Sequence, residues 1–531
     1  MQQKIPAILI ILAISFVLIE LPHLEIGLPL HSDSYDNIAA AQETISQGTI
    51  FIGDPYAPPK EKSIYFNENP GYDLETGYVV LLLLLSFFPF ISLTSLPLFF
   101  PWLVSILVFL STFILLRKLC RQDFTAFFSS LFIFFLPSTQ QMLGPLFLVA
   151  SSFGLILVPL LLLLGFNFLT QRTHAKELAL LLIFTAFIYP PSVVISLIAL
   201  FFFIIASKTN FDQNKPLVRV FAVLSILILV MYMIWGTMIA GIDPIQNILS
   251  YGFAAILAGV DFSINTLLLR QVTLENIPFF HEYLGLPLFI LSIIALIYFI
   301  FREFKEKNND QNLIFLSAIV LSILTFLSFE IGRGIIVPTE RLVLFAAYFL
   351  LLTLGIFVSE LIIFVKNYFS EKNLLNKIFS QNFFLFFTLL LTIIIIFSNP
   401  IQTKDLQLNI QPNEFDSLEW IENNTAQNSL ILAPPSLSKA IKVFTNRDVT
   451  CTVFTRFGCN KNLNLLVSSF FFASCEEKEK IIDDYFSADY VFLQKKLQLP
   501  SRILEFSEQN CDFLNKKFEG KNTIIYKIES R

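Results

Sequence analysis

The chain has 531 residues, of which 55% are apolar and only 15% are charged, and its mean hydropathy is +0.70. Soluble globular chains carry roughly 25% charged residues, so this composition excludes an ordinary soluble protein and predicts a polytopic α-helical membrane protein. The net charge of −5 and the pI of 5.6 argue against a nucleic-acid partner, because nucleic-acid phosphates are bound by clustered Lys and Arg.

The N-terminal apolar run at 4–21 follows Lys4 and lacks a small-residue cleavage site, so we expect an uncleaved first membrane helix. Further membrane helices are expected at 97–116, 124–138, 145–168, 178–189, 191–207, 217–240, 283–301, 312–330, 341–365 and 380–398.

The basic residues set the predicted topology. Lys and Arg gather in loops at 117–121, 171–176, 208–219, 302–307 and 366–377. The positive-inside rule places these loops in the cytoplasm, which predicts about eleven transmembrane helices, with the N-terminus inside and the C-terminus outside. If the apolar stretch at 78–93 also crossed the membrane, the basic loop at 117–121 would lie outside, against the positive-inside rule. Because Pro89 interrupts this stretch, we expect an outer juxtamembrane or re-entrant helix there.

Two domains follow from this scheme. Residues 1–399 form the transmembrane domain, with a first outer loop at 23–77, and residues 400–531 form a small soluble α/β domain on the outer side. In the second domain we expect helices at 414–425, 460–474, 476–486 and 500–508, strands at 429–433, 449–454 and 489–493, and an edge strand at 522–527.

Cysteine usage agrees with an outer location of the second domain. Cys120 falls in a predicted cytoplasmic loop, whereas the other four cysteines are Cys451, Cys459, Cys475 and Cys511. In an oxidising compartment these four would form two disulfides, and three connectivities are open. Zinc is the weaker alternative, since no Cys-x-x-Cys pair and no His follows residue 400.

The most informative motif lies after the first apolar run. Asp33 opens the segment, Asp36 follows one turn later, and an Ala-rich stretch is closed by Gly48. This arrangement resembles the first outer loop of type C glycosyltransferases, such as the protein O-mannosyltransferases, the aminoarabinose transferases and the oligosaccharyltransferase catalytic subunit. It departs from the pattern at Ser34, where these enzymes usually have Glu or Pro.

The resemblance implies a membrane glycosyltransferase that moves a sugar from a polyprenyl-phosphate carrier to an acceptor glycan, lipid or protein. Phrases at 418–421, 445–447 and 488–492 resemble the outer C-terminal domains of many prokaryotic members of the superfamily. The implied location is the cytoplasmic membrane of a prokaryote, with the active site and the C-terminal domain on the outer side.

Such a transfer needs a base for the acceptor hydroxyl and cationic help for the leaving phosphate. Asp33 is the candidate catalytic base, with Asp36 as a substrate-binding candidate. The alternative interpretation of Asp33 is a helix N-cap, with Asp36 in a favourable first turn. For the phosphate, the candidates are Arg341 in a Pro-x-x-Arg tip and Arg333 in the same tip, because guanidinium matches phosphate oxygens. The alternative interpretation of both residues is that the guanidinium extends along the helix end to the lipid headgroups.

A second acidic motif comprises His281 and Glu282 at the start of a span, and it resembles the second outer acidic site of type C enzymes. Its carboxylate would bind the acceptor, or join Asp33 and Asp36 around a divalent ion such as Mg²⁺ or Mn²⁺. The alternative is an interfacial pair that hydrates a helix start. No cofactor is certain from these residues.

Two other functions stay open. A transporter would show interrupted helices at matching places in the two halves of its sequence. The interruption at 189–191 has no evident counterpart elsewhere in this chain. A catalytically silent scaffold of the same fold is favoured by Ser34, since fold does not imply function.

Overall fold

The structure is a computed structural model. It describes residues 4–26, 32–48, 55–56, 76–88, 91–136, 138, 144–145, 147, 149–206, 284, 286–305, 310–331, 339–371, 386–394, 414–452, 461–499, 502–505 and 511–529. The chain divides into two compact units, one comprising Met1–Pro22 and Phe100–Asp405, and the other comprising His23–Phe99 and Leu406–Arg531.

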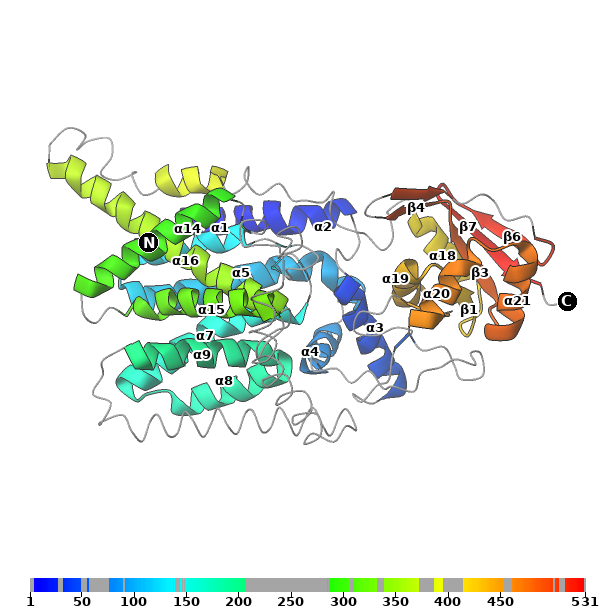
Figure 1. The fold of residues 1–531 in the computed structure, drawn as a ribbon, viewed down its shortest axis with the longest axis horizontal. Helices are drawn as coiled ribbons and strands as arrows, with labels where there is room; N and C mark the ends of the chain where they lie inside the picture. The colour runs from blue at the N-terminus through cyan, green and yellow to red at the C-terminus, as the bar shows by residue number, and fades with distance from the viewer. Residues whose placement is uncertain are drawn as a thin grey trace, which may run out of the picture. The chain divides into compact units, whose positions relative to one another are not determined.

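The described part of the first unit is helical (Figure 1). Its N-terminal segment runs through α1 (Lys4–Ser15) and the π-helical turn Phe16–Glu20 into α2 (Leu21–Ile26), which crosses the unit boundary. The other helices are α5 (Leu96–Cys120), α6 (Asp123–Leu131) with the 3₁₀ turn Phe132–Phe135, α7 (Ala150–Gln171), α8 (Ala175–Ile188), α9 (Pro190–Ala206), α14 (Leu286–Lys305), α15 (Asn312–Ile331) and α16 (Thr339–Glu371), with a further helical stretch at 386–394.

Helix α16 is the core of this bundle, because it packs against α6, α14 and α15 and its most apolar stretch is 89% buried. A Cβ on Gly355 would come within 2.7 Å of the Cα of Ser129, so the backbones of α16 and α6 touch at that residue. The hydroxyls of Thr112 and Tyr348 lie 2.8 Å apart in a buried hydrogen bond that joins α5 to α16. Small residues and paired hydroxyls at helix contacts are typical of membrane bundles.

Three described helices are long and apolar enough to cross a membrane, namely Leu96–Cys120, Ala150–Gln171 and Arg341–Tyr368. Shorter apolar helices occur at Leu9–Leu24, Gly77–Ser86, Asp123–Phe135, Pro190–Ile204, Leu286–Arg302 and Asn312–Leu327. Each predicted span that falls on described residues coincides with a helix, whereas 217–240 lies outside the described residues. The number of spans and their orientation stay predictions.

The second unit combines residues His23–Phe99 with the C-terminal segment. Helix α3 (Ser32–Gln47) packs against α4 (Thr76–Ser86). The expected helix at 78–93 is therefore shorter than predicted, and it ends ahead of Pro89 because proline disfavours helical backbone in the residue before it.

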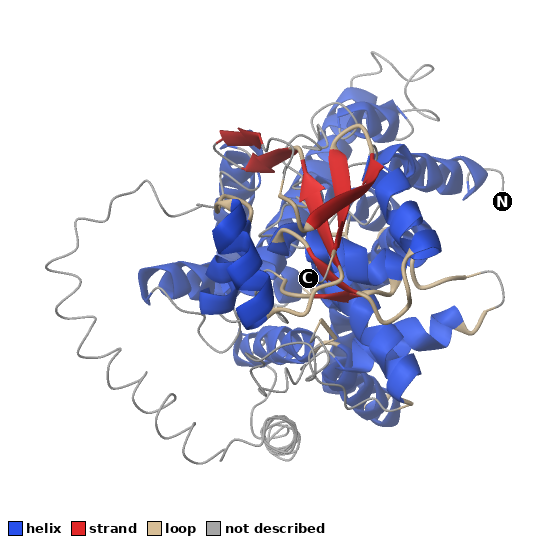
Figure 2. Cartoon of the chain, turned by 90° about the vertical axis from the view of Figure 1, so that its right-hand side faces the viewer, coloured by secondary structure: helices blue, strands red, loops and turns tan. Residues whose placement is uncertain are grey.

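The C-terminal segment forms a five-stranded mixed sheet in the order β2-β1-β3-β7-β6 (red in Figure 2). The strands are β1 (Leu430–Leu432), β2 (Asp448–Val449), β3 (Tyr490–Gln494), β6 (Leu514–Glu519) and β7 (Thr523–Ile528). Strand β1 is parallel to β2 and β3, while β7 is antiparallel to both β3 and β6.

Helices cover both faces of this sheet. Side chains alternate along a strand, so Leu430 and Leu432 of β1 share one face with Val491 and Leu493 of β3. These four residues belong to a buried apolar cluster with α20 (Lys461–Phe470) and α21 (Cys475–Tyr485). The alternate residue of β1, Ile431, is also fully buried. Helix α18 (Phe415–Asn424) contacts β6 and β7, and α19 (Pro435–Thr445) contacts β2.

The structure differs from the sequence prediction at three places in this segment. Within the helix expected at 500–508, the described residues Arg502–Glu505 form strand β5, which pairs with β4 (Lys496–Leu499), because short apolar runs do not distinguish strand from helix. The strand at 522–527 is interior rather than at an edge, since β6 lies outside it. Helix α19 was not predicted, although Pro435 in its first turn is a common helix start.

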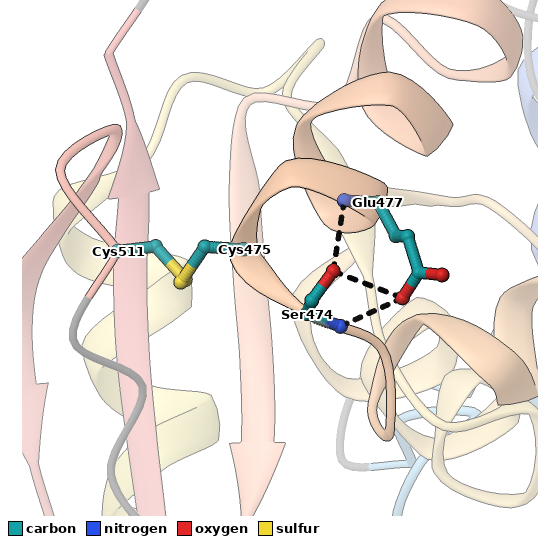
Figure 3. Close-up of a disulfide and its surroundings, with 4 residues drawn as sticks. All are labelled: Ser474, Cys475, Glu477 and Cys511. Carbon is teal, nitrogen blue, oxygen red and sulfur yellow. Dashed lines mark hydrogen bonds between the residues drawn. A yellow bond between two sulfur atoms is a disulfide. The ribbon is translucent and has the colours of Figure 1, made fainter.

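One disulfide is described in full. Cys475, the first residue of α21, is bonded to Cys511 ahead of β6 (Figure 3). Cys451 is also disulfide-bonded, Cys459 lies outside the described residues, and Cys120 is a buried free thiol in α5. Helix α21 begins with a capping box, in which the Ser474 hydroxyl accepts from the Glu477 N–H and the Glu477 carboxylate accepts from the Ser474 N–H. The Ser474 N–H and the Ser474 hydroxyl both donate to the Glu477 carboxylate, and these two hydrogen bonds hold the pKa of that carboxyl below its ordinary value.

Candidate active site

The predicted catalytic segment folds as the 16-residue helix α3. The run of Ala39, Ala40 and Ala41 favours a helix because alanine loses no side-chain entropy there. Gly48 ends the helix with a φ of +65°, and its N–H donates to the carbonyl oxygen of Thr44 at 3.0 Å. This left-handed cap suits glycine, so the predicted helix end at Gly48 is confirmed.

Helix α3 is polar in sequence yet buried on most of its surface. Every residue from 34 to 41 is buried, including Ser34, Asp36 and Asn37. Its larger apolar side chains are only Tyr35, Ile38 and Ile45, and Ile45 is 59% exposed. Apolar burial therefore contributes less to holding this helix than it does for a usual amphipathic helix.

A buried ion pair joins α3 to the C-terminal segment. The Nζ of Lys439, in α19, lies 2.8 Å from Oδ1 and 2.9 Å from Oδ2 of Asp36. The side chain of Asp36 is 0% exposed and that of Lys439 is 2% exposed. The Lys439 ammonium also lies 5.8 Å from the centroid of the buried Tyr56 ring. Removing one partner of such a pair would leave a buried charge uncompensated.

Two further contacts connect the same helices. Gln42 Nε2 donates to the carbonyl oxygen of Val443 at 3.0 Å, and the rings of Tyr35 and Phe444 meet edge to face with centroids 6.1 Å apart. Burial raises the pKa of the Tyr35 hydroxyl, so that group stays protonated. The α3 and α19 faces thus meet through a charge pair, an amide hydrogen bond and an aromatic contact.

Asp33 has a different environment from Asp36. It lies in the first turn of α3, where the helix dipole stabilises a carboxylate, and it is only partly buried. Helix α3 begins at Ser32, so Asp33 falls inside the helix rather than ahead of it. Of the two acids, Asp33 and Asp36, only Asp33 is partly exposed.

The other candidates lie in the first unit or outside the described residues. Arg341 is in the first turn of α16 and is partly buried. Arg333, His281 and Glu282 lie outside the described residues.

The described residues are not arranged to bind a divalent ion through the carboxylate of Asp36. Among the described residues, no group of three or more His, Cys, Asp or Glu side chains is arranged to hold a metal. The ammonium of Lys439 lies against both oxygens of Asp36 and would repel a second cation. We therefore assign no chemical step to a metal.

Sequence reasoning missed Lys439 and Gln42. Lys439 is one of two lysines in α19, and nothing in the local pattern separates it from Lys442, which pairs with Asp448 at 3.1 Å. The only sequence signal was an apolar context, since Lys439 is followed directly by Ala440 and Ile441.

The comparisons with known proteins identify the fold. No protein-family model matches the chain, and no curated protein matches it in sequence. Among solved structures, the oligosaccharyltransferase from Archaeoglobus fulgidus, tethered to an acceptor peptide containing the NVT sequon, has a TM-score of 0.59 and 14% identity over 92% of this chain and 69% of that chain. The same enzyme in complex with Zn and sulfate has a TM-score of 0.54 and 16% identity over 92% and 68%.

A second solved protein matches over nearly the full length of both chains. ArnT from Cupriavidus metallidurans, solved bound to undecaprenyl phosphate, has a TM-score of 0.51 and 9% identity over 99% of this chain and 98% of that chain. The chain therefore has the type C glycosyltransferase fold. Together with the long apolar helices, this fold makes it an integral membrane protein.

Proposed function

We propose that the protein is a membrane glycosyltransferase that transfers a sugar from a polyprenyl-phosphate carrier to an acceptor hydroxyl on the outer face of the membrane. The observation that carries the proposal is the match to ArnT over 99% of this chain, combined with a partly exposed acid, Asp33, directly ahead of the buried residues 34–41 of α3. ArnT was solved with undecaprenyl phosphate, a carrier of the proposed class.

In the proposed reaction Asp33 accepts the proton of the acceptor hydroxyl as its oxygen attacks the anomeric carbon of the sugar. The bond between that carbon and the phosphate oxygen breaks, and polyprenyl phosphate leaves with the bonding electrons. A carboxylate held in place contributes about 10²–10⁴-fold as a general base.

The leaving phosphate gains negative charge in this step, and we assign Arg341 to stabilise it. Its planar guanidinium can donate two hydrogen bonds to phosphate oxygens. Arg333, His281 and Glu282 remain further proposed contacts to donor or acceptor.

The proposal gives Asp36 a different role from the substrate contact expected from the sequence. Its carboxylate is fully buried against Lys439, so we assign it to holding α3.

The test uses the purified full-length protein in detergent or nanodiscs with a panel of polyprenyl-phosphate sugars. Release of polyprenyl phosphate, with water or an added sugar hydroxyl as acceptor, is measured by mass spectrometry. We expect turnover of at least one donor, and its loss in the Asp33→Asn variant. No turnover of any donor, with donor binding retained, would instead favour a silent scaffold of the same fold.

A further inference from the structure

Asp36 and Lys439 come from segments 403 residues apart in the chain, yet they form the most deeply buried ion pair that the described residues contain. A buried ion pair is weak evidence for stability, because desolvation offsets most of the attraction between the charges. Its better supported use is to fix one arrangement of two elements, since a displaced partner would leave a charge unpaired.

We infer that the Asp36–Lys439 pair is a positioning device, through which α19 of the C-terminal segment holds the helix that carries Asp33. This inference rests on the proposed function, because it takes Asp33 as the reactive group. Lys439 thereby becomes a positioning residue of the reaction, although it belongs to the α/β part of the chain.

The geometry of α3 supports this role. Residues three apart in a helix are neighbours on the helix surface, so Asp33 and Asp36 lie on the same side of α3, about one turn apart. Fixing the carboxylate of Asp36 fixes the orientation of the first turn, and with it the direction of Asp33. A displacement of about 1 Å at a reacting group lowers the rate by about 10²-fold.

The other described contacts between α3 and α19 are uncharged. Tyr35 meets the ring of Phe444, and Gln42 adds one neutral hydrogen bond to Val443, worth about 1 kcal/mol. Tyr35 and Ile38 are the only large buried apolar side chains of α3, since its other buried apolar residues are alanines. We therefore assign the defined orientation of α3 against α19 to the charged contact.

The chain supplies a matched control on the same helix. Lys442 lies one turn after Lys439 and pairs with Asp448 at 3.1 Å, with side chains 11% and 19% exposed. This pair joins α19 to β2 and does not involve α3. Lys442→Met therefore removes a similar ion pair without releasing the catalytic helix.

The experiment compares Lys439→Met, Lys442→Met and the double variant Asp36→Leu/Lys439→Met in the full-length protein. We expect Lys439→Met to lower kcat by about 10- to 100-fold with little change in the donor KM. Lys442→Met should keep kcat within about threefold of wild type. The double variant, which replaces the pair with apolar groups of similar size, should recover most of the lost kcat, because apolar packing can replace a buried ion pair.

Two kinetic results would overturn the inference. Full activity of Lys439→Met would show that the pair positions nothing. A double variant as inactive as Lys439→Met, with the same melting temperature as wild type, would show that Asp36 contacts the substrate itself.

Amide hydrogen exchange separates this inference from the proposed function, because it needs no donor. The α3 amides should exchange faster in Lys439→Met than in wild type or Lys442→Met, while the amides of β1 and β3 stay protected. Unchanged protection of α3 would refute the inference even if the enzyme is active. If wild type turns over no donor, the proposed function fails, and the exchange comparison still decides whether Lys439 holds α3.

Discussion

Asp33 and Asp36 lie one turn apart on the same helix but in opposite environments: Asp36 is 0% exposed against Lys439, whereas Asp33 is partly exposed. The charge of Asp36 is thus paired inside the protein, whereas Asp33 lies partly exposed in the first turn of the helix. This difference supports the proposal that Asp36 holds the helix and that Asp33 takes part in the reaction.

Asp33→Asn should therefore abolish turnover and leave the fold intact. The loss should reach about 10²-fold or more, because the amide cannot accept the acceptor proton. The free energy of unfolding should change by less than about 0.5 kcal/mol, because the side chain of Asp33 is partly exposed. Steady-state kinetics and thermal melting measure the two effects. Glu43→Gln, which changes another partly exposed acid of α3, is the control and should stay active. Activity of Asp33→Asn above about a tenth of wild type would leave Asp33 with only a favourable interaction with the helix dipole in the first turn of α3.

Arg341→Lys should weaken donor binding and slow turnover, because lysine keeps the charge but loses the two-pronged contact with phosphate. An Arg that merely extends to the headgroups would tolerate this change, since Lys extends equally well. Binding of a polyprenyl phosphate and kcat report the difference.

Arg302→Lys is the matched control for this prediction. Arg302 donates to both carboxylate oxygens of Glu360, at 2.7 and 2.8 Å, and we assign it no contact with the donor. Unaltered donor affinity in Arg341→Lys would transfer the proposed role to Arg333.

The predicted topology places the C-terminal segment outside and the loop at 171–176 inside. In intact cells a membrane-impermeant maleimide should label Phe472→Cys, whose side chain is 64% exposed, and should not label Lys176→Cys, which is also exposed. Cys120 is buried and should add little background. Labelling of Lys176→Cys but not Phe472→Cys would reverse the orientation.

Glu519 gives the C-terminal segment a stabilising contribution that depends on pH. Hydrogen bonds from Lys495 and Lys516 lower the pKa of its carboxyl from 4.5 to about 2. Because the folded pKa is depressed, the contribution is complete above pH 4.5 and is lost as the pH falls to about 2.

The stability difference between wild type and Glu519→Gln should follow the same window, and it should shrink with added salt because these side chains are exposed. Melting curves over this pH range measure it. A difference that stays constant down to pH 2 would contradict the assignment.

Much of the fold follows from local pattern. The long apolar runs predict the helices of the first unit, and the short buried apolar runs predict β1 and β3. Gly48 marks the end of α3 because few other residues adopt its backbone conformation. These features depend on neighbours in the sequence, so the sequence reveals them.

The site depends on contacts that no local pattern records. Asp36 and Lys439 are ordinary charged residues in their own segments, and their roles exist only because α3 packs against α19. Strand β5 falls within the helix expected at 500–508 for the same reason, since pairing with β4 rather than local preference decides its conformation.

The strand order has a consequence for how the C-terminal segment matures. Strands β3 and β6 do not touch, and β7, which follows both in the chain, fills the place between them. Until β7 has been synthesised, β3 offers an open edge that is liable to pair with other chains. Folding of this sheet is therefore delayed until its last strand in the chain is available to pair.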